Sequence, residues 1–395
     1  MQLKGVLSNQ TFTFVLANFL EQLVYYGLRS FFIIFVIDLS TKGILNLSEQ
    51  QAQNAYTQFL FYLGFAYLIA GPIIDALKKP RRAMYTGITL LIASCALLMY
   101  SPGGLEYALV LALAGMAMFR PASMAQISLC IGRQENRLNT AFSLQYFAIM
   151  LAALFSPILF GLLYETYGYQ ASFLVAACLL AVILPLIRRM WDTSQFTSWQ
   201  YHKISCRTCV LVVITTLFFY SIYWGFYEVS GNYTLDADPK GTLNMVNPIA
   251  ILLLLPLVVL VQYKDKLSNL AGVLLGLGIF AITLLVLVLH VKGALGLDNL
   301  QAVAVLSVLW AASEALLMPS MYTTLAKYTP ARYFSTVFGV ALFATTVMVN
   351  FVLNNMTGLD DNYLLGISAI FAVVGFVSLV ITRHKLTNVD VNAKV

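Results

Sequence analysis

Long apolar segments separated by short polar ones repeat along the 395-residue chain. Each is near the roughly 20 residues that an α-helix needs to cross the hydrocarbon core of a bilayer. Twelve such runs lie at residues 11–38, 52–77, 83–101, 106–130, 140–163, 170–187, 208–233, 246–263, 269–291, 300–326, 335–356 and 363–382. The pattern predicts an all-α membrane protein with twelve transmembrane helices.

The lysines and arginines between these runs predict how the chain is oriented. If both termini are cytoplasmic, the inside segments hold 18 of these cations, and the outside loops hold three, Lys42, Lys240 and Lys292. Cytoplasmic loops of membrane proteins are enriched in lysine and arginine. We therefore expect a multi-pass protein of the cell membrane with both termini in the cytoplasm.

Composition excludes several classes of protein. The chain is 60% hydrophobic and 10% charged, whereas soluble domains carry roughly 25% charged residues, and the polar connections are too short for a catalytic or nucleotide-binding domain. The net charge of +6 reflects the loop cations, so no nucleic-acid partner is expected. The sequence contains no HExxH, GxSxG or P-loop motif, so neither an enzyme nor an ATP-driven pump is expected, and no metal site or cofactor is predicted.

The longest interior polar stretch, residues 188–207, divides the predicted helices into two sets of six. The predicted domains are therefore a first six-helix bundle at 1–187, a cytoplasmic linker at 188–207, and a second bundle with a short tail at 208–395. This layout resembles the major facilitator superfamily, in which two helical bundles rock around a central site.

The polar segment after the second apolar run resembles a loop motif of the same superfamily. Asp75 follows Gly71 by four residues and precedes a cluster of lysines and arginines at positions 78–82. The resemblance implies that Asp75 acts in gating, by pairing with the loop cations or with a neighbouring helix. The alternative is a positively charged cytoplasmic loop that contains an incidental aspartate.

Five ionisable residues lie within the apolar runs: Glu21, Arg29, Arg120, Glu228 and Glu314. Each costs about 2.5–3.5 kcal/mol at the centre of a membrane helix, so these residues should face a polar interior and pair. Both cations belong to the first predicted bundle, which suits a cavity closed by salt bridges between bundles. The alternative is a set of structural ion pairs that fix the register of the helices.

Six segments match, in chain order, the motifs of one transporter family, and the chain resembles the proton-coupled oligopeptide transporters. They are Glu21–Arg29 (first-helix ExxERFxYYGxR), Phe119–Pro121 (F-K-P-N), Phe142–Phe147 (F-S-x-F-Y-M), Trp224–Glu228 (W-x-x-x-E-Q), Asn247–Pro248 (N-P) and Glu314–Pro319 (E-x-x-x-x-P). The resemblance implies proton-coupled uptake of di- and tripeptides or similar small zwitterions by alternating access.

The resemblance also implies a substrate site. Arg120 would bind the substrate carboxylate and Glu314 the amine, and these two side chains would pair in the empty protein. Asn247 would donate or accept hydrogen bonds together with Tyr25 or Tyr26. Trp224 would form the wall of a side-chain pocket.

Coupling and gating roles follow from the same resemblance. Glu21, Glu228 and Glu314 are the candidates for proton coupling, with the proton gradient in place of a cofactor as the energy source. Arg29 and Glu228 would form an outer gate, and Asp75 would act in gating on the cytoplasmic side. The expected partners are a small zwitterion and membrane lipid, with the protein as a monomer.

Departures from the family pattern leave alternatives open. Asn18 and Gln22 occupy positions where the family has charged residues, and Arg120 replaces its lysine. Arginine does not release its proton in proteins, so one coupling group is absent. A proton-independent facilitator or exchanger of another small organic ion is therefore the alternative, and a non-transporting membrane nutrient sensor is a second.

Overall fold

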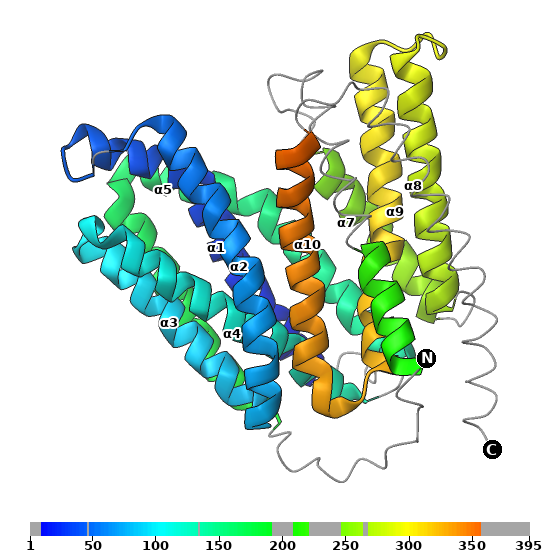
Figure 1. Ribbon diagram of the computed structural model, residues 1–395, viewed down its shortest axis with the longest axis horizontal. Helices are drawn as coiled ribbons and strands as arrows, with labels where there is room; N and C mark the ends of the chain where they lie inside the picture. Colours follow the sequence, from blue (N-terminus) through cyan, green and yellow to red (C-terminus); the bar gives the residue numbers. More distant parts are fainter. Residues whose placement is uncertain are drawn as a thin grey trace. The chain divides into compact units, whose positions relative to one another are not determined.

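The computed structural model describes residues 9–45, 47–132, 135–191, 208–220, 246–263 and 268–356. In these residues all regular structure is helical (Figure 1). The helices are α1 (Asn9–Thr41), α2 (Glu49–Leu77), α3 (Pro80–Tyr100), η2 (Pro102–Gly104), α4 (Leu105–Ile131), α5 (Glu135–Arg189), Thr208–Tyr220, α7 (Val246–Tyr263), α8 (Asn269–Val291), α9 (Asn299–Tyr328), η5 (Ala331–Tyr333) and α10 (Phe334–Met356).

The predicted apolar runs coincide with these helices to within a few residues wherever the chain is described. Within the described residues, seven helices are long and apolar enough to cross a membrane: α1, α2, α3, α4, α5, α8 and α9. The predicted all-α membrane fold is confirmed. The count of twelve stays a prediction, because the run at 363–382 and half of the run at 208–233 lie outside the described residues.

Two of the predicted runs, 140–163 and 170–187, fall in the single long helix α5. Its 55 residues correspond to roughly 80 Å of helix, more than twice the hydrocarbon thickness of about 30 Å. The backbone is not helical at Gly168, where φ is 78° and ψ is 179°. Glycine adopts such a positive φ readily because it lacks a Cβ atom. The break therefore separates α5 into two lengths, as the two runs predicted.

Contacts divide the chain into two compact units. In the described residues, unit 1 contains α1 to α4, α5 from Ala148 onward, η5, and α10 as far as Val347. Unit 2 contains α5 as far as Phe147, the helix at 208–220, and α7, α8 and α9. The predicted domain boundary stays a prediction, since residues 192–207 of the predicted linker lie outside the described residues.

In unit 1, α3 and α4 lie side by side (Figure 1). Two glycines allow this contact: a Cβ atom on Gly87 would lie 2.6 Å from the Gly115 carbonyl oxygen, and one on Gly115 would lie 2.8 Å from the Gly87 oxygen. Small residues at membrane helix interfaces let backbones approach closely. Helix α4 also packs along α2, so its position, and that of Arg120, is fixed from two sides.

A second close contact in unit 1 joins α2 to the beginning of α10. A Cβ atom on Gly71 would lie 2.6 Å from the Ser335 carbonyl oxygen, and one on Gly339 would lie 2.5 Å from the Tyr67 oxygen. Larger side chains at these glycines would push the two backbones apart. The glycines thereby bring the end of α2 against the first turn of α10.

In unit 2, α8 and α7 both pack on α9, and α8 lies alongside α9 in Figure 1. The Ser313 hydroxyl of α9 donates to the Gly276 carbonyl of α8 at 2.7 Å. The first residues of α5 also contact α9, because the rings of Phe142 and Tyr322 lie 5.6 Å apart. These contacts position Glu314 on α9.

Candidate functional site

One face of α1 carries the polar side chains that the sequence analysis singled out. Asn18, Glu21 and Tyr25 follow spacings of three and four residues, which place them on the same side of a helix. Asn18 and Glu21 are buried. Buried polar groups need hydrogen-bond partners, and the partners of these two residues come from α4 and from α1 itself.

Arg120 of α4 is the centre of this cluster. Its Nε donates to Glu21 Oε1 at 3.0 Å, and its Nη2 lies 3.0 Å from the same oxygen. Its Nη1 donates to the Tyr67 hydroxyl at 3.0 Å, and its Cζ lies 4.4 Å from the centroid of the Tyr25 ring. The side chains of Arg120 and Glu21 are 14% and 1% exposed. The result is a buried ion pair within two membrane-spanning helices.

The second carboxylate oxygen of Glu21 is also occupied. The Gln22 side-chain amide donates to Glu21 Oε2 at 3.0 Å. The Ser123 hydroxyl lies 3.3 Å from Asn18 Oδ1 and 2.9 Å from the Arg120 carbonyl. The two neutral residues at positions 18 and 22 therefore belong to the same hydrogen-bonded cluster as the ion pair.

Within unit 1, Arg120 pairs with an acid that the sequence analysis did not assign to it. The sequence analysis predicted that Glu314 would pair with Arg120 in the empty protein. Within unit 1 the acid at Arg120 is Glu21, whereas Glu314 belongs to unit 2, so the predicted pairing stays a prediction. The physical reason for the pair with Glu21 is packing: α1 and α4 belong to the same unit and bring their charged residues within reach.

Glu314 lies in unit 2 and is 2% exposed. Its Oε1 accepts a hydrogen bond from the Tyr146 hydroxyl of α5. One helical turn before Tyr146 along α5, Phe142 packs on Tyr322, and the Tyr322 hydroxyl lies 2.8 Å from that of Tyr220. The described surroundings of this acid are thus rich in aromatic rings.

Asp75 lies at the end of α2 and contacts a neighbouring helix. Its carboxylate accepts from the backbone N–H groups of Ser335 and Thr336 at 3.0 and 2.7 Å, and from the Thr336 hydroxyl at 2.7 Å. A carboxylate at a helix N-terminus satisfies backbone donors and interacts favourably with the helix dipole. Of the two contacts predicted for Asp75, the structure shows the one with a helix, and its gating role stays a prediction.

The other predicted site residues are partly visible. The Arg29 guanidinium lies 5.8 Å from the centroid of the Tyr56 ring, and the rings of Tyr25 and Tyr26 make an edge contact at 5.3 Å. Asn247 is half-buried at the start of α7. Trp224 and Glu228 lie outside the described residues, so the structure does not describe the predicted outer gate or the predicted pocket wall.

Two residues of the site had no role in the sequence analysis. Tyr67 accepts a hydrogen bond from Arg120, and Tyr146 donates to Glu314. A tyrosine inside a membrane span needs a partner for its hydroxyl, and that rule was the available signal for both. In the described part of the chain, no group of three or more His, Cys, Asp and Glu side chains has an arrangement that could hold a metal ion.

Comparison with proteins of known sequence agrees with the resemblance to peptide transporters. Dipeptide and tripeptide permease A of Pectobacterium carotovorum is 21% identical over 198 residues, which are 49% of this chain and 38% of that protein. The di-/tripeptide transporter of Lactococcus lactis is 25% identical over 166 residues, 40% of this chain and 33% of the relative. These alignments thus span less than two fifths of the length of either relative.

Solved structures show the same fold. A transporter of the oligopeptide (POT) family in complex with 5-aminolevulinic acid superposes with a TM-score of 0.65, at 15% identity, over 94% of this chain and 95% of the other. The human organic anion transporter MFSD10 superposes with a TM-score of 0.69, at 12% identity, over 94% and 99% of the two chains. The sequence profile of the Major Facilitator Superfamily matches residues 15–353, and the chain belongs to that family.

Proposed function

We propose that the protein is a secondary active transporter that takes up small zwitterions, such as di- and tripeptides, together with protons. The observation that carries this proposal is the buried ion pair between Glu21 and Arg120. Charged residues inside membrane helices are costly and usually mark substrate or proton pathways. The matched peptide permeases support the choice of substrate class.

The ion pair has the right chemistry to recognise a zwitterion. The planar guanidinium of Arg120 suits a carboxylate, with which it forms two parallel hydrogen bonds. A substrate ammonium can replace the guanidinium at Glu21 while the substrate carboxylate replaces Glu21 at Arg120. Neither buried charge is then left without a counter-ion, which would cost several kcal/mol. Glu314, which the sequence analysis predicted to bind the substrate ammonium, is the second candidate for that role.

The same exchange offers a route for proton coupling. A buried carboxyl group without a counter-ion is more stable when protonated. The substrate carboxylate first draws Arg120 away from Glu21. If the substrate ammonium then departs before Arg120 returns, Glu21 has no counter-ion and takes up a proton. No cofactor is then required, because the proton gradient supplies the energy.

The architecture that goes with this function is the one predicted from the sequence. We propose twelve transmembrane helices in two six-helix bundles, in the cell membrane, with both termini in the cytoplasm and the protein as a monomer surrounded by lipid. The loop cations support the orientation. Alternating access then exposes the site to one side of the membrane at a time.

A facilitator or exchanger of another small organic ion is the second candidate. Asn18 and Gln22 favour it, because neutral residues stand where related transporters have charges, and both take part in the hydrogen bonds around the ion pair. Such a protein would bind and release its substrate without net proton movement.

Uptake into proteoliposomes separates these two candidates. The proposal predicts that an inward proton gradient drives accumulation of a labelled dipeptide, and that Glu21→Gln abolishes this accumulation but spares counterflow exchange. Accumulation that depends neither on the pH gradient nor on Glu21 would establish the facilitator instead. Asp38→Asn is a matched control, since Asp38 pairs with Lys42 at the end of α1.

The proposed outer gate of Arg29 and Glu228 is tested in the same assay. Neutralising either residue should impair transport, and the charge swap Arg29→Glu with Glu228→Arg should restore part of it. Single variants with wild-type transport would contradict the gate.

A further inference from the structure

A cavity inside unit 1 adjoins the ion pair. It has a volume of about 90 Å³, and its wall comes from α1, α2, α3, α4 and the later part of α5. Glu21 and Tyr25 belong to this wall, and both also contact Arg120. The cavity therefore begins at the charged cluster that the proposed function assigns to the ends of a zwitterion.

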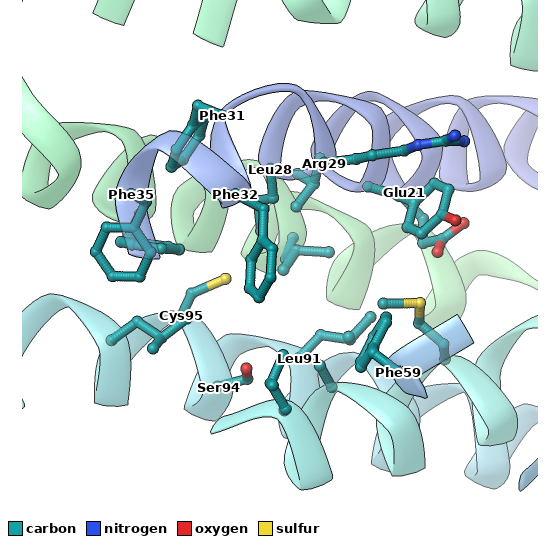
Figure 2. Close-up of a pocket in the computed structure, with 18 of the residues that line it drawn as sticks. Glu21, Leu28, Arg29, Phe31, Phe32, Phe35, Phe59, Leu91, Ser94 and Cys95 are labelled. Carbon is teal, nitrogen blue, oxygen red and sulfur yellow. The ribbon is translucent and has the colours of Figure 1, made fainter. Parts of the chain in front are cut away.

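Away from the charged cluster the wall is almost entirely apolar. Figure 2 shows Glu21 and Arg29 toward one end of the cavity and Phe31 and Phe35 toward the other. The wall also includes Phe32, Phe59, Leu91, Leu98, Met116 and Phe173. A mostly apolar wall with a few polar groups at one place is typical of sites for small organic ligands.

The residues of α1 that line the cavity differ in how exposed they are. Tyr25, Leu28 and Phe32 are half-buried and follow one another at spacings of three and four residues, whereas Phe31 and Phe35 are buried. The stripe formed by Tyr25, Leu28 and Phe32 thus runs along α1 from the ion pair toward the buried rings of Phe31 and Phe35. A ligand held at the ion pair can place an apolar group along this stripe.

An apolar cavity of this size needs an explanation. Protein interiors are packed as densely as organic crystals, and their voids are small and few. Apolar cavities are also destabilising, because the atoms that line them lose contacts. An apolar group of a ligand would restore those contacts, so occupation gives the cavity a function.

We propose that this cavity binds the bulky apolar side chain of the substrate, so that the protein prefers zwitterions with an aromatic or large aliphatic group. This inference rests on the proposed function and adds the substrate class to it. The charged ends of the substrate lie at Arg120 and Glu21, and its side chain extends between α1 and α3 toward Phe35. The pairing of a charged end with a long apolar wall selects against small zwitterions that lack a side chain.

The test compares dipeptides that differ only in their side chains. Isothermal titration calorimetry on the purified full chain measures the affinity for Ala-Ala, Ala-Phe and Phe-Ala. Full burial of a phenylalanine side chain predicts roughly 10- to 100-fold tighter binding for at least one of the two phenylalanine dipeptides than for Ala-Ala.

Variants in α4 connect that preference to the cavity. Ala112 lines the cavity, so Ala112→Leu fills part of it; Ala114 is half-buried on the same helix and is not part of the wall. In Ala112→Leu, the affinities for the phenylalanine dipeptides and for Ala-Ala should differ by no more than about threefold. Ala112→Val should give an intermediate ratio of these affinities, and Ala114→Leu should keep the wild-type ratio. Melting temperatures of the ligand-free proteins show whether each variant is folded, and the smaller valine change provides the test if the leucine variant is not.

The outcomes separate the inference from the function on which it rests. If Ala-Ala binds as tightly as the phenylalanine dipeptides, or if Ala112→Leu and Ala112→Val keep the wild-type ratio, the cavity does not bind a substrate side chain and the transport proposal stands. An equal loss of affinity for all three dipeptides in the Ala112 variants also overturns the inference, because the cavity would then not distinguish their side chains. If none of the dipeptides binds to the wild type, the proposed substrate class and the inference are both wrong.

Discussion

The two units each contain a buried glutamate, and the two acids have different neighbours. In unit 1, Glu21 lies 3.0 Å from the guanidinium of Arg120. In unit 2, Glu314 accepts a hydrogen bond from the neutral hydroxyl of Tyr146. The first contact joins two full charges, and the second joins a carboxyl group to an uncharged donor.

This difference determines what a ligand must carry in order to replace each contact. A cation that replaces the Tyr146 hydroxyl at Glu314 takes the place of an uncharged donor. At Glu21 a cation would leave the Arg120 guanidinium buried and unpaired, which costs several kcal/mol. A zwitterion avoids this cost because it supplies a substitute for each member of the pair. The ion pair of unit 1 therefore favours a ligand that carries both charges.

The largest expected effect comes from removing the charged partner. Arg120→Ala leaves Glu21 buried without its cation, and we expect a loss of stability of roughly 3–5 kcal/mol, visible as a lower melting temperature, together with a loss of dipeptide binding. Arg120→Lys keeps the positive charge and should retain part of both. The double variant Glu21→Gln with Arg120→Gln removes both charges and should recover much of the stability. A single Arg120→Ala variant that melts at the wild-type temperature would contradict the assignment of a buried ion pair.

A smaller effect is expected at Asp75, an acid whose partners are backbone N–H groups. Asp75→Ala removes the acceptor at the first turn of α10 and should cost roughly 1–3 kcal/mol, the range for caps and for hydrogen bonds to charged groups. Thermal unfolding of the purified protein measures this loss. Asp38→Ala is the control, because Asp38 pairs with the exposed Lys42, and it should melt like the wild type. Equal melting temperatures for the two variants would show that the α2–α10 contact does not contribute to stability.

The smallest effect is expected for the tyrosine hydroxyls. Tyr146→Phe removes one neutral donor from Glu314 and should cost about 1 kcal/mol, the usual net value of such a hydrogen bond. Tyr67→Phe removes the corresponding hydroxyl from Arg120 and serves as the matched change in unit 1. Both should retain dipeptide binding, as measured by calorimetry. If Tyr146→Phe lowered the melting temperature as much as Arg120→Ala, the contrast between the two acids would be wrong.

The helices could be predicted from the sequence because apolar length directly reports membrane spans. The runs at 83–101 and 269–291, for example, fall in α3 and α8. Even the division of α5 was visible, since Gly168 lies in the gap between two runs. These features depend on local composition and need no knowledge of how the helices pack.

The partner of Arg120 could not be predicted in the same way. The sequence showed that a cation inside a span needs an acid, and it offered three, Glu21, Glu228 and Glu314. Which acid pairs with it depends on which helices lie next to α4, and the pattern of apolar residues does not contain that information. The tyrosines posed the same difficulty, because the chain has 22 of them and only packing distinguishes Tyr67 and Tyr146 from the rest.

The most direct test of the zwitterion site is competition for binding of a labelled dipeptide by three unlabelled compounds: the parent dipeptide, its N-acetyl form and its C-terminal amide. Each capped form lacks one charge, so it can replace only one member of the pair between Glu21 and Arg120. The account predicts that both bind at least about 30-fold more weakly than the parent, which corresponds to the 2–5 kcal/mol expected when one partner of a buried charge pair is missing. If both capped forms compete as well as the parent, the ion pair is not the site of zwitterion recognition.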